Sequence, residues 1–378
     1  MYERQKESLR CLARSYPAVL IAGPQQVGKT TIAKEVFGYL PYISLADAFV
    51  WDQARLDPKS FFTHYDDGAI FDDIQHVSEL LTYLQVAIDA KHQNGRFVLI
   101  GSQNFEMNEQ IPEYLAGHVD ILTLLPLSIA ELQSEKMTIP ELIISGGYPR
   151  LHTEKRENVW KFYSLYIQKY LEQNVRQYHN VDNLDLFLDF MRLCAKHVGQ
   201  SLDIVNLSHD LGVDMATVQK WIFILTTSHI IFLLQPYRPY YCNFNNFVDL
   251  PPKIYFCDTG ILSHLLNIKL AKEIETHFAK DKFYKNIAIL EEIKGRQLDM
   301  PPNVYFWQDQ AGHEVDCVSR RGSQLQAFKI EAKATMQKEM FQDLDCFQVL
   351  EPSVNGCLIY GDDTFTVFSK TEAVCPVF

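Results

Sequence analysis

The sequence predicts an α/β fold in which a parallel sheet with flanking helices is followed by a helical module and a second α/β domain. In roughly the first third of the chain, short apolar segments alternate with helical patterns. Apolar residues then recur at helical spacing to about residue 234, and two strand patterns follow nearer the C-terminus. The chain has 378 residues, and at roughly 150 residues per domain we expect domains at 1–132, 133–250 and 251–378.

The composition is that of a folded protein. Hydrophobic residues make up 47% of the chain, charged residues 22% and aromatic residues 12%, which excludes a disordered or fibrous class. The formal net charge is −12 at pH 7, so the chain as a whole repels nucleic acid. Any contact with DNA therefore requires a local basic surface.

Cysteine usage and the lack of long apolar runs favour the cytoplasm. The eight cysteines are scattered without a CxxC pair, which disfavours structural zinc and favours reduced thiols. The N-terminal residues are charged, unlike a signal peptide. The longest apolar runs are far shorter than the ~20 residues that span a bilayer. We expect a soluble, cytoplasmic protein without membrane contact.

The first strand pattern, residues 18–22, runs directly into a phosphate-binding motif. Residues 23–30 match G-x-x-x-x-G-K-[ST], the P-loop, and a helical pattern follows from Thr31. Glycines let backbone N–H groups close around phosphate, and the helix start adds its positive dipole end. Lys29 is expected to reach the β and γ phosphates, and Thr30 to contact Mg²⁺. The residues expected to hold ATP are Gly23, Pro24, Gln25, Gln26, Val27, Gly28, Lys29, Thr30 and Thr31.

A pair of carboxylates follows the next buried strand pattern. Residues 68–71 are apolar and lead into Asp72 and Asp73, at the edge where parallel strands present their functional groups. We expect Asp72 to hold Mg²⁺ through water and Asp73 to act as general base for the attacking water. The alternative is that either aspartate only caps a helix that begins at Ile74.

A polar group also follows the third apolar strand pattern, residues 97–100. Ser102 and Gln103 come after Gly101, and either side chain could orient the water near the γ-phosphate. A plain turn at the strand end is the alternative. A fourth strand pattern, residues 121–125, completes the expected sheet.

These segments resemble a group of prokaryotic AAA-type P-loop ATPases whose C-terminal region is a domain of unknown function similar to PD-(D/E)XK nucleases. Members typically read GPRQVGKT, IDEIQ, GSS or GSQ, LAGR, PLS-x-x-EL and GGYP. The resemblance covers nearly the whole chain and implies ATP and Mg²⁺ as cofactors. The counterparts here are Gly23–Thr30, Phe71–Gln75, Gly101–Gln103, Leu115–His118, Pro126–Leu132 and Gly146–Pro149.

Three positions depart from this pattern, and all three concern the nucleotide. Gln25 and His118 stand where members prefer arginine, and Asp73 where they prefer glutamate. Since aspartate is one methylene shorter, its carboxylate would be displaced by more than ~1 Å, which can cost about 100-fold in rate. His118 lacks the permanent charge of an arginine finger, which is worth roughly 10³ to 10⁵ in rate. We predict ATP binding with slow hydrolysis.

The middle of the chain predicts a helical connector and a winged-helix-like module. Residues 133–180 have helical periodicity, and residues 186–234 read as helices around a turn at Gly212. The exposed face of the last helix would offer Thr217, Gln219 and Lys220 to a DNA major groove. One lysine is a weak basic surface, so a protein-docking or packing module is the favoured alternative. In the resembled group this region precedes a K-x-Y-F-x-D-x-G string, here Lys253–Gly260.

The C-terminal region predicts two strands, residues 315–318 and 325–333, joined by a turn at residues 321–323. Alternation along the second strand places Lys329, Glu331 and Lys333 on one face. If the strands are adjacent, Asp316 and Glu331 could share a hard divalent ion, and Lys333 could stabilise a phosphorane-like transition state. That is the PD-(D/E)XK arrangement of a restriction-endonuclease-like domain. An ordinary polar sheet face is the alternative.

One further departure bears on that metal. Members commonly read Phe-Glu-Asn at the start of this domain, whereas this chain reads Tyr284-Lys285-Asn286. A lysine in place of an acid repels a divalent ion, so nuclease activity is disfavoured. Glu291 or Glu292, about two turns later, is a candidate acid that could compensate.

These patterns predict a slow Mg-dependent ATPase whose nucleotide state controls its C-terminal half. The alternatives are a catalytically silent scaffold that holds nucleotide and an ATP-gated DNA nuclease. DNA or a protein partner is expected to contact the C-terminal half. Oligomers are possible, because sites of the AAA type often lie between subunits.

Overall fold

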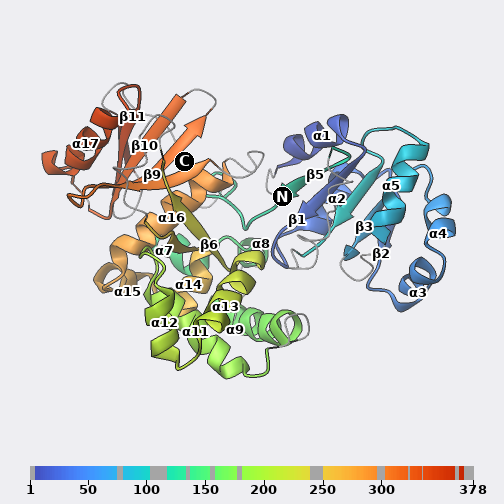
Figure 1. Ribbon diagram of the computed structural model, residues 1–378, viewed down its shortest axis with the longest axis horizontal. Helices are drawn as coiled ribbons and strands as arrows, with labels where there is room; N and C mark the ends of the chain where they lie inside the picture. The colour runs from blue at the N-terminus through green and yellow to red at the C-terminus, as the bar shows by residue number, and fades with distance from the viewer. Residues whose placement is uncertain are drawn as a thin grey trace. The chain divides into compact units, whose positions relative to one another are not determined.

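A computed structural model describes residues 5–74, 80–102, 117–132, 137–153, 158–176, 181–238, 250–295, 303–321, 324–333, 335–361 and 366–369. The chain divides into two compact units, and Figure 1 shows the elements of each. Unit 1 comprises residues 1–127 and takes in residues 227–229. Unit 2 comprises residues 128–226 and 230–378.

Unit 1 is built on a five-stranded, fully parallel sheet with the order β2-β3-β4-β1-β5. Every residue of β1, β3 and β4 is buried, as expected for parallel strands covered on both faces. The predicted α/β class with a parallel sheet is confirmed. The strands are β1 (Ala18–Ala22), β2 (Tyr42–Ser44), β3 (Ala69–Asp72), β4 (Phe97–Ile100) and β5 (Val119–Thr123).

Helices flank this sheet. Asp57 caps the start of α4 by accepting a hydrogen bond from the Ser60 N–H, which satisfies one of the free donors at the helix start. Apolar residues of α4 and α5 pack on β3 and β4 in one buried cluster. The helices of unit 1 are α1 (Lys6–Ser15), α2 (Lys29–Val36), α3 (Ala48–Leu56), α4 (Pro58–His64) and α5 (Leu80–Ala90).

Unit 2 begins with helices. Capping residues mark several helix starts, since Thr138, Asn158 and Asp203 each accept a backbone N–H with the side-chain oxygen. The helices are α7 (Ile139–Ser145), α8 (Pro149–Thr153), α9 (Val159–Lys169), the π-helix η3 (Tyr170–Arg176), α11 (Leu184–Lys196), α12 (Ile204–Leu211), α13 (Met215–Thr227), α14 (Thr259–Leu265), α15 (Ala271–Thr276), α16 (Lys280–Lys294), the 3₁₀-helix η5 (Lys338–Phe341) and α17 (Gln342–Leu350).

A seven-stranded mixed sheet with the order β12-β11-β10-β9-β8-β6-β7 completes unit 2. Helix α16 packs on β9 and β10, and α17 packs on β9, β10 and β11. The predicted turn at residues 321–323 lies partly outside the described residues, but β9 and β10 pair antiparallel as expected. The strands are β6 (Ile231–Pro236), β7 (Lys253–Phe256), β8 (Val304–Gln308), β9 (Glu314–Arg321), β10 (Gln324–Glu331), β11 (Asn355–Tyr360) and β12 (Thr366–Ser369).

Two of the strings noted in the sequence meet at a buried centre of unit 2. The Asp258 carboxylate accepts a hydrogen bond from the Gly147 N–H at 2.8 Å. Tyr163 donates its hydroxyl to the Ser145 carbonyl at 2.8 Å. A Cβ added at Gly260 would lie 2.2 Å from the Tyr163 hydroxyl, so glycine is required for this close packing. The GGYP and D-x-G strings therefore join α7 and α14 to α9.

The predicted boundary at residue 250 falls between β6 and β7, which pair with each other, and the three-domain division stays a prediction. Within the described residues, no helix has both the length and the apolar character needed to cross a membrane.

Candidate functional site: an ATP site and a lysine-filled carboxylate cluster

The P-loop of unit 1 has the backbone of a phosphate cradle. Gly23 (φ +137°) and Gly28 (φ +96°) adopt left-handed conformations that disfavour other residues. A Cβ at Gly23 would lie 2.2 Å from the Leu124 carbonyl oxygen. Gly28 is the N-cap of α2, so the first N–H groups of that helix point toward the loop. These features fit the predicted binding of a triphosphate.

Lys29 is buried, with only 9% of its surface exposed. Its Nζ donates to the carbonyls of Gly23 at 2.7 Å and Pro24 at 2.8 Å. Burial lowers the pKa of Lys29 to about 8, although the charges of Asp72 and Asp73 oppose this shift. Phosphate oxygens are stronger acceptors for an ammonium than carbonyls are, so Lys29 is poised to exchange its partners for a nucleotide.

The predicted magnesium residues lie together. Thr30 at the start of α2 donates its hydroxyl to Asp72 Oδ2 at 2.6 Å, across 42 residues of sequence. Asp72 Oδ1 accepts the Asp73 N–H at 2.9 Å. A hydroxyl and a carboxylate at this spacing are oxygen donors that suit Mg²⁺, so the residues fit the ion that ATP carries.

Tyr42 is a member of this site that the sequence did not reveal. Its hydroxyl donates to Asp72 Oδ2 at 2.9 Å, and Lys34 Nζ lies 3.4 Å from its ring centroid. Burial, followed by the bond to Asp72, raises the pKa of Tyr42 to about 12. The signal was available only through strand pairing, because Tyr42 lies on β2 opposite Ile70 of the carboxylate strand.

The remaining predicted ATPase residues follow from the strand order. Strand β4 lies between β1 and β3, so Ser102 follows the strand between the P-loop strand and the carboxylate strand. Asp73 has φ +59°, a left-handed conformation that aspartate tolerates better than most residues. Gln103 lies outside the described residues. His118 precedes β5 and accepts the Ala18 N–H with its carbonyl. The roles of Ser102 and Asp73 stay predictions.

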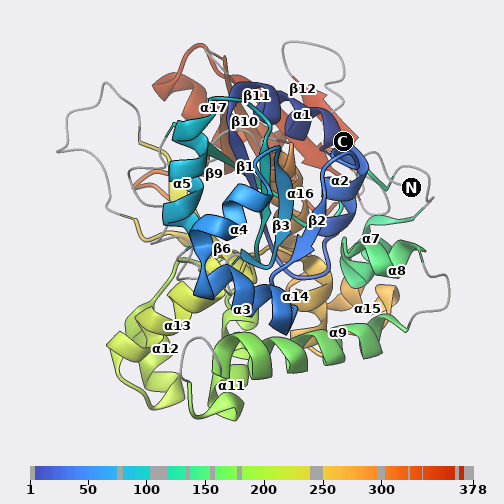
Figure 2. The same cartoon turned by 90° about the vertical axis from the view of Figure 1, so that its right-hand side faces the viewer.

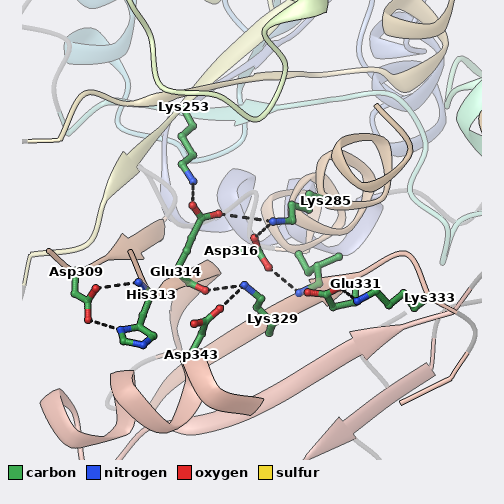
Figure 3. A network of polar contacts seen from close by, with 11 residues as sticks. Lys253, Lys285, Asp309, His313, Glu314, Asp316, Lys329, Glu331, Lys333 and Asp343 are labelled. Carbon is green, nitrogen blue, oxygen red and sulfur yellow. Dashed lines mark hydrogen bonds and ion pairs between the residues drawn. The ribbon is translucent and has the colours of Figure 1, made fainter. Parts of the chain in front are cut away.

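In unit 2, a lysine occupies the centre of the predicted metal cluster (Figure 3). Lys285 Nζ of α16 lies 2.5 Å from Asp316 Oδ1 of β9, and Asp316 is buried. Asp316 Oδ2 accepts the Ile330 N–H at 2.8 Å. Burial alone would raise the pKa of Asp316, but Lys285 and Lys329 hold it below its usual value. Both carboxylate oxygens are therefore engaged.

Neighbouring side chains extend this ion network. Lys253 Nζ lies 2.5 Å from Glu314 Oε2, and Lys285 Nζ lies 3.7 Å from Glu314 Oε1. Lys329 Nζ lies 2.5 Å from Oδ2 of Asp343, which belongs to α17. Burial alone would lower the pKa of Lys285, but the surrounding carboxylates, Asp316 first, raise it well above its ordinary value.

The prediction that Lys333 lies on the strand is wrong. Strand β10 ends at Glu331, which pairs with Tyr360 near the end of β11, and β9 begins only at Glu314. Strand β10 ends here because its parallel neighbour β11 ends at Tyr360 and its antiparallel neighbour β9 begins at Glu314. Lys333 lies beyond it, 3.5 Å from Glu331.

The residues that could have compensated for Lys285 are engaged elsewhere. Glu291 accepts the Ile129 N–H at 2.7 Å and pairs with Lys294 at 2.9 Å. Glu292 accepts the Ser319 hydroxyl at 2.8 Å. Over the described ranges of the chain, no three His, Cys, Asp or Glu side chains gather as a metal site would require.

Asn286, next to Lys285, bonds the backbone of β7. Its side chain accepts the Phe256 N–H and donates to the Phe256 carbonyl, both at 2.8 Å. Asn286 is fully buried. It therefore anchors α16 to β7 and takes no part in the carboxylate cluster.

The helix predicted to face DNA presents a mixed surface. Gln219 and Lys220 of α13 are exposed, as expected, whereas Thr217 bonds Asp214 through its N–H and hydroxyl. Met215 is 53% exposed and Phe223 42% exposed on the same helix. At spacings of four residues, Met215, Gln219 and Phe223 share one face.

Comparison with known families divides the chain into three matches. Residues 15–133 match the model of an AAA domain. Residues 137–272 match a domain of unknown function (DUF8612), and residues 280–377 match a second one (DUF4143). With the parallel sheet and the P-loop geometry, the first match establishes an AAA-type P-loop ATPase domain that binds ATP.

The two bacterial relatives of this chain are longer than it and are described as uncharacterized. Uncharacterized proteins of Mycobacterium bovis and Mycobacterium tuberculosis are each 26% identical over 328 residues, which cover 86% of this chain and 72% of theirs. Among solved structures, a Walker-type ATPase of Pyrococcus abyssi is 12% identical with a TM-score of 0.47, covering 70% of this chain and 95% of that chain. The RuvB Holliday junction branch migration motor of Thermotoga maritima is 18% identical with a TM-score of 0.31, covering 61% and 89%.

Proposed function

We propose that this chain is a slow, Mg-dependent ATPase whose nucleotide state acts on unit 2 to control the binding of a protein partner. The ATPase proposal rests on one observation. The Thr30 hydroxyl donates a hydrogen bond to Asp72 Oδ2 at 2.6 Å, beside the buried Lys29. Bound Mg²⁺ would neutralise charge on the phosphates. Asp73 would take a proton from the attacking water, and Ser102 would orient that water.

The slow rate follows from the carboxylate at position 73. Aspartate reaches one methylene less far than glutamate, and a displaced base loses rate steeply. The chain also carries His118 where the resembled group prefers arginine. A slow hydrolysis step gives the ATP-bound form a long lifetime, which suits a switch better than a motor.

A route for the nucleotide signal begins where the P-loop packs on the chain segment that leads into unit 2. Gly23 packs so closely on Leu124 that a Cβ would lie 2.2 Å from its carbonyl. Unit 2 begins only four residues later, at Ser128. A change at Gly23 when phosphate binds would therefore displace the segment that leads into unit 2.

The same segment is tied at its other end to α16. The Ile129 N–H donates to Glu291 of α16 at 2.7 Å, and α16 also carries Lys285, which holds Asp316. Residues 124–129 thus connect the P-loop to the helix that orders the carboxylate cluster. This supports a signal path that runs from the P-loop through residues 124–129 and α16 to the carboxylate cluster.

Several features support a nuclease-like fold that no longer cleaves. The order α16, β8, β9, β10, α17, β11 places Asp316 and Glu331 on neighbouring strands, as in the predicted PD-(D/E)XK arrangement. Lys285 holds the carboxylate that a metal would need. A permanent ammonium there disfavours Mg²⁺ through like-charge repulsion, so the observations favour binding over DNA cleavage.

The helical module supports a protein partner over DNA. Helices α11, α12 and α13 precede the pair β6 and β7, and Ser201 forms a bridge with Lys253 of β7, which is winged-helix-like. The exposed face of α13 carries Met215 and Phe223. Apolar side chains are typical of protein interfaces, whereas DNA binding relies on several basic residues.

The deciding experiment measures Mg-ATP binding by calorimetry and phosphate release, for wild type beside Lys29→Ala. We expect binding and slow turnover in wild type, and a loss of about 10² to 10³ in turnover in the variant, as for removal of one charge-stabilising donor. Lys59→Ala, an exposed lysine of the same unit, is the matched control.

Three results would contradict the proposal in different ways. No heat on adding Mg-ATP to folded protein would refute the ATP site itself. Binding without turnover above the Lys29→Ala background would leave a silent scaffold that holds nucleotide. Mg-dependent nicking of plasmid DNA that is lost in Asp316→Ala would instead establish the ATP-gated nuclease.

A further inference from the structure

Unit 2 contains a cavity of about 1100 Å³ that neither the ATP site nor the carboxylate cluster uses. Helices α9, α11 and α14 line it, together with residues that follow α14 and α15. Figure 2 shows α9, α11 and α14 near one another in the lower part of the view. Its volume slightly exceeds the usual range of small-molecule sites, which runs from ~300 to ~1000 Å³.

The body of the cavity is aliphatic. Ile167, Leu171, Leu188 and Leu265 all line it. The indole of Trp160 also lies in the wall, but its ring is already in contact with the His264 ring, at 4.1 Å between centroids. Lys269 Nζ lies 4.7 Å from the Trp160 centroid. The aliphatic wall therefore suits an alkyl chain better than an aromatic base.

The charged part of the lining is cationic. Arg192 and Lys196 lie one turn apart on α11 and are both exposed. Arg192 contacts Asp189 at 2.9 Å, but an exposed pair of this kind is weak. No aspartate or glutamate is among the described residues that line the cavity. In a chain with net charge −12, this concentration of positive charge runs against the average.

A buried nitrogen in the wall also lacks a partner. His264 Nδ1 is buried without a hydrogen bond from the described residues, and Nε2 lies 3.5 Å from the Ser164 hydroxyl. Burial, with the charges of Arg192 and Lys269, lowers the pKa of His264 to about 4, so the ring is neutral at pH 7. The neutral ring adds no charge to the wall, so the cationic part of the lining is Arg192 and Lys196.

We infer that this cavity binds a small amphipathic anion, namely an alkyl or acyl chain with a carboxylate or phosphate head. The chain would lie against Ile167, Leu171 and Leu188. The head would bond Arg192 and Lys196 at the cavity mouth. The inference stands apart from the ATPase proposal, because it uses none of the residues of unit 1.

Calorimetric titration with dodecanoate, dodecyl phosphate and dodecyltrimethylammonium, each below its micelle concentration, tests the inference on the full chain. We expect one dodecanoate or dodecyl phosphate per chain, and the comparison of the two assigns the head group. In the double variant Arg192→Ala with Lys196→Ala, affinity for the anions should fall at least about tenfold, since charge-assisted contacts are lost. The ammonium compound should bind at least tenfold more weakly than the anions.

A second double variant, Lys220→Ala with Lys338→Ala, removes the same charge from exposed positions outside the cavity lining, and it should bind like wild type. Both arginine and lysine of the test variant are exposed, so folding, checked by circular dichroism, should be preserved. Equal weakening in both double variants, equal binding of the ammonium compound, or no saturable binding of either anion would each overturn the inference.

Discussion

Each unit of the molecule places a lysine beside a buried aspartate, but the two lysines are held differently. Lys29 bonds two carbonyls of its own loop, at 2.7 and 2.8 Å, and its pKa is lowered to about 8. Lys285 bonds Asp316 directly at 2.5 Å, and its pKa is raised well above the ordinary value. In unit 1, Asp72 instead accepts hydroxyls from Thr30 and Tyr42.

The difference separates an exchangeable cation site from a permanent one. The carbonyl bonds of Lys29 can be replaced by phosphate, and Asp72 bonds the neutral hydroxyls of Thr30 and Tyr42, which a cation arriving with ATP can replace. At Asp316 the cation is part of the chain and cannot leave. The same pair of residue types thus supports ligand exchange in one unit and fixed structure in the other.

The largest expected effect tests whether Lys285 is a fixed partner of Asp316. Lys285→Ala should lower the free energy of unfolding by about 3–5 kcal/mol, because a fully buried carboxylate loses its partner. Urea unfolding followed by fluorescence measures the change. Lys282→Ala on the same helix should cost far less. Lys285→Met combined with Asp316→Leu should recover most of the loss, and failure to recover would contradict the assignment of that loss to the unpaired Asp316 carboxylate.

Next in size is the rate of hydrolysis. Asp73→Glu should raise ATP turnover by up to about 100-fold, because the longer side chain brings its carboxylate closer to the attacking water. Phosphate release under saturating Mg-ATP measures the rate, with Asp73→Asn as the inactive reference. Turnover in Asp73→Glu equal to or below wild type would contradict the role assigned to Asp73.

The lowered pKa of Lys29 predicts a pH dependence in the alkaline range. Below pH 8 Lys29 is charged before nucleotide arrives, so its titration leaves affinity unchanged. Above pH 8 binding requires uptake of a proton, and the Kd for Mg-ATP should rise about tenfold between pH 7 and pH 9. Calorimetry in buffers of different ionisation enthalpy would also register the proton. A flat profile, identical to that of Lys29→Ala, would refute the shift.

The smallest effect concerns the residue that holds Asp72 from the side. Tyr42→Phe removes one hydrogen bond to the carboxylate and should raise the Mg²⁺ concentration for half-maximal turnover about three- to tenfold. The expected change is small because Tyr42 is 37% exposed, and water can replace part of the lost hydrogen bond. Tyr39→Phe, at an exposed tyrosine nearby, should leave that concentration unchanged. Identical curves for the two variants would remove Tyr42 from the site.

Local chemistry made the first unit predictable. Strands β1 and β4 begin and end at the predicted residues, because buried parallel strands read as uninterrupted apolar runs. The P-loop glycines specify a backbone that few other residues can adopt. Gln103 could not be compared, since it lies outside the described residues.

Contacts across long stretches of sequence were predictable where motifs name both residues, as for Thr30 and Asp72, but individual bonds outside those motifs were not. Lys285 and Asp316 are 31 residues apart, and Tyr42 and Asp72 are 30 apart, so their pairing depends on how helix and sheet pack. The alternation that placed Lys333 with Glu331 is a local pattern, whereas the end of β10 is set by where its neighbours end. Sequence periodicity contains no information about where the neighbouring strands end.

The bonds of Asn286 have a consequence for association between chains. Strand β7 is the last strand of its sheet, and a bare outer strand invites pairing with another molecule. Here Gly199 and Gln200 bond the backbone of Ile254, and the Asn286 amide bonds that of Phe256. One side-chain amide imitates the peptide group of a missing neighbour. The outward hydrogen-bonding positions of β7 are thereby closed, and the sheet ends within its own chain.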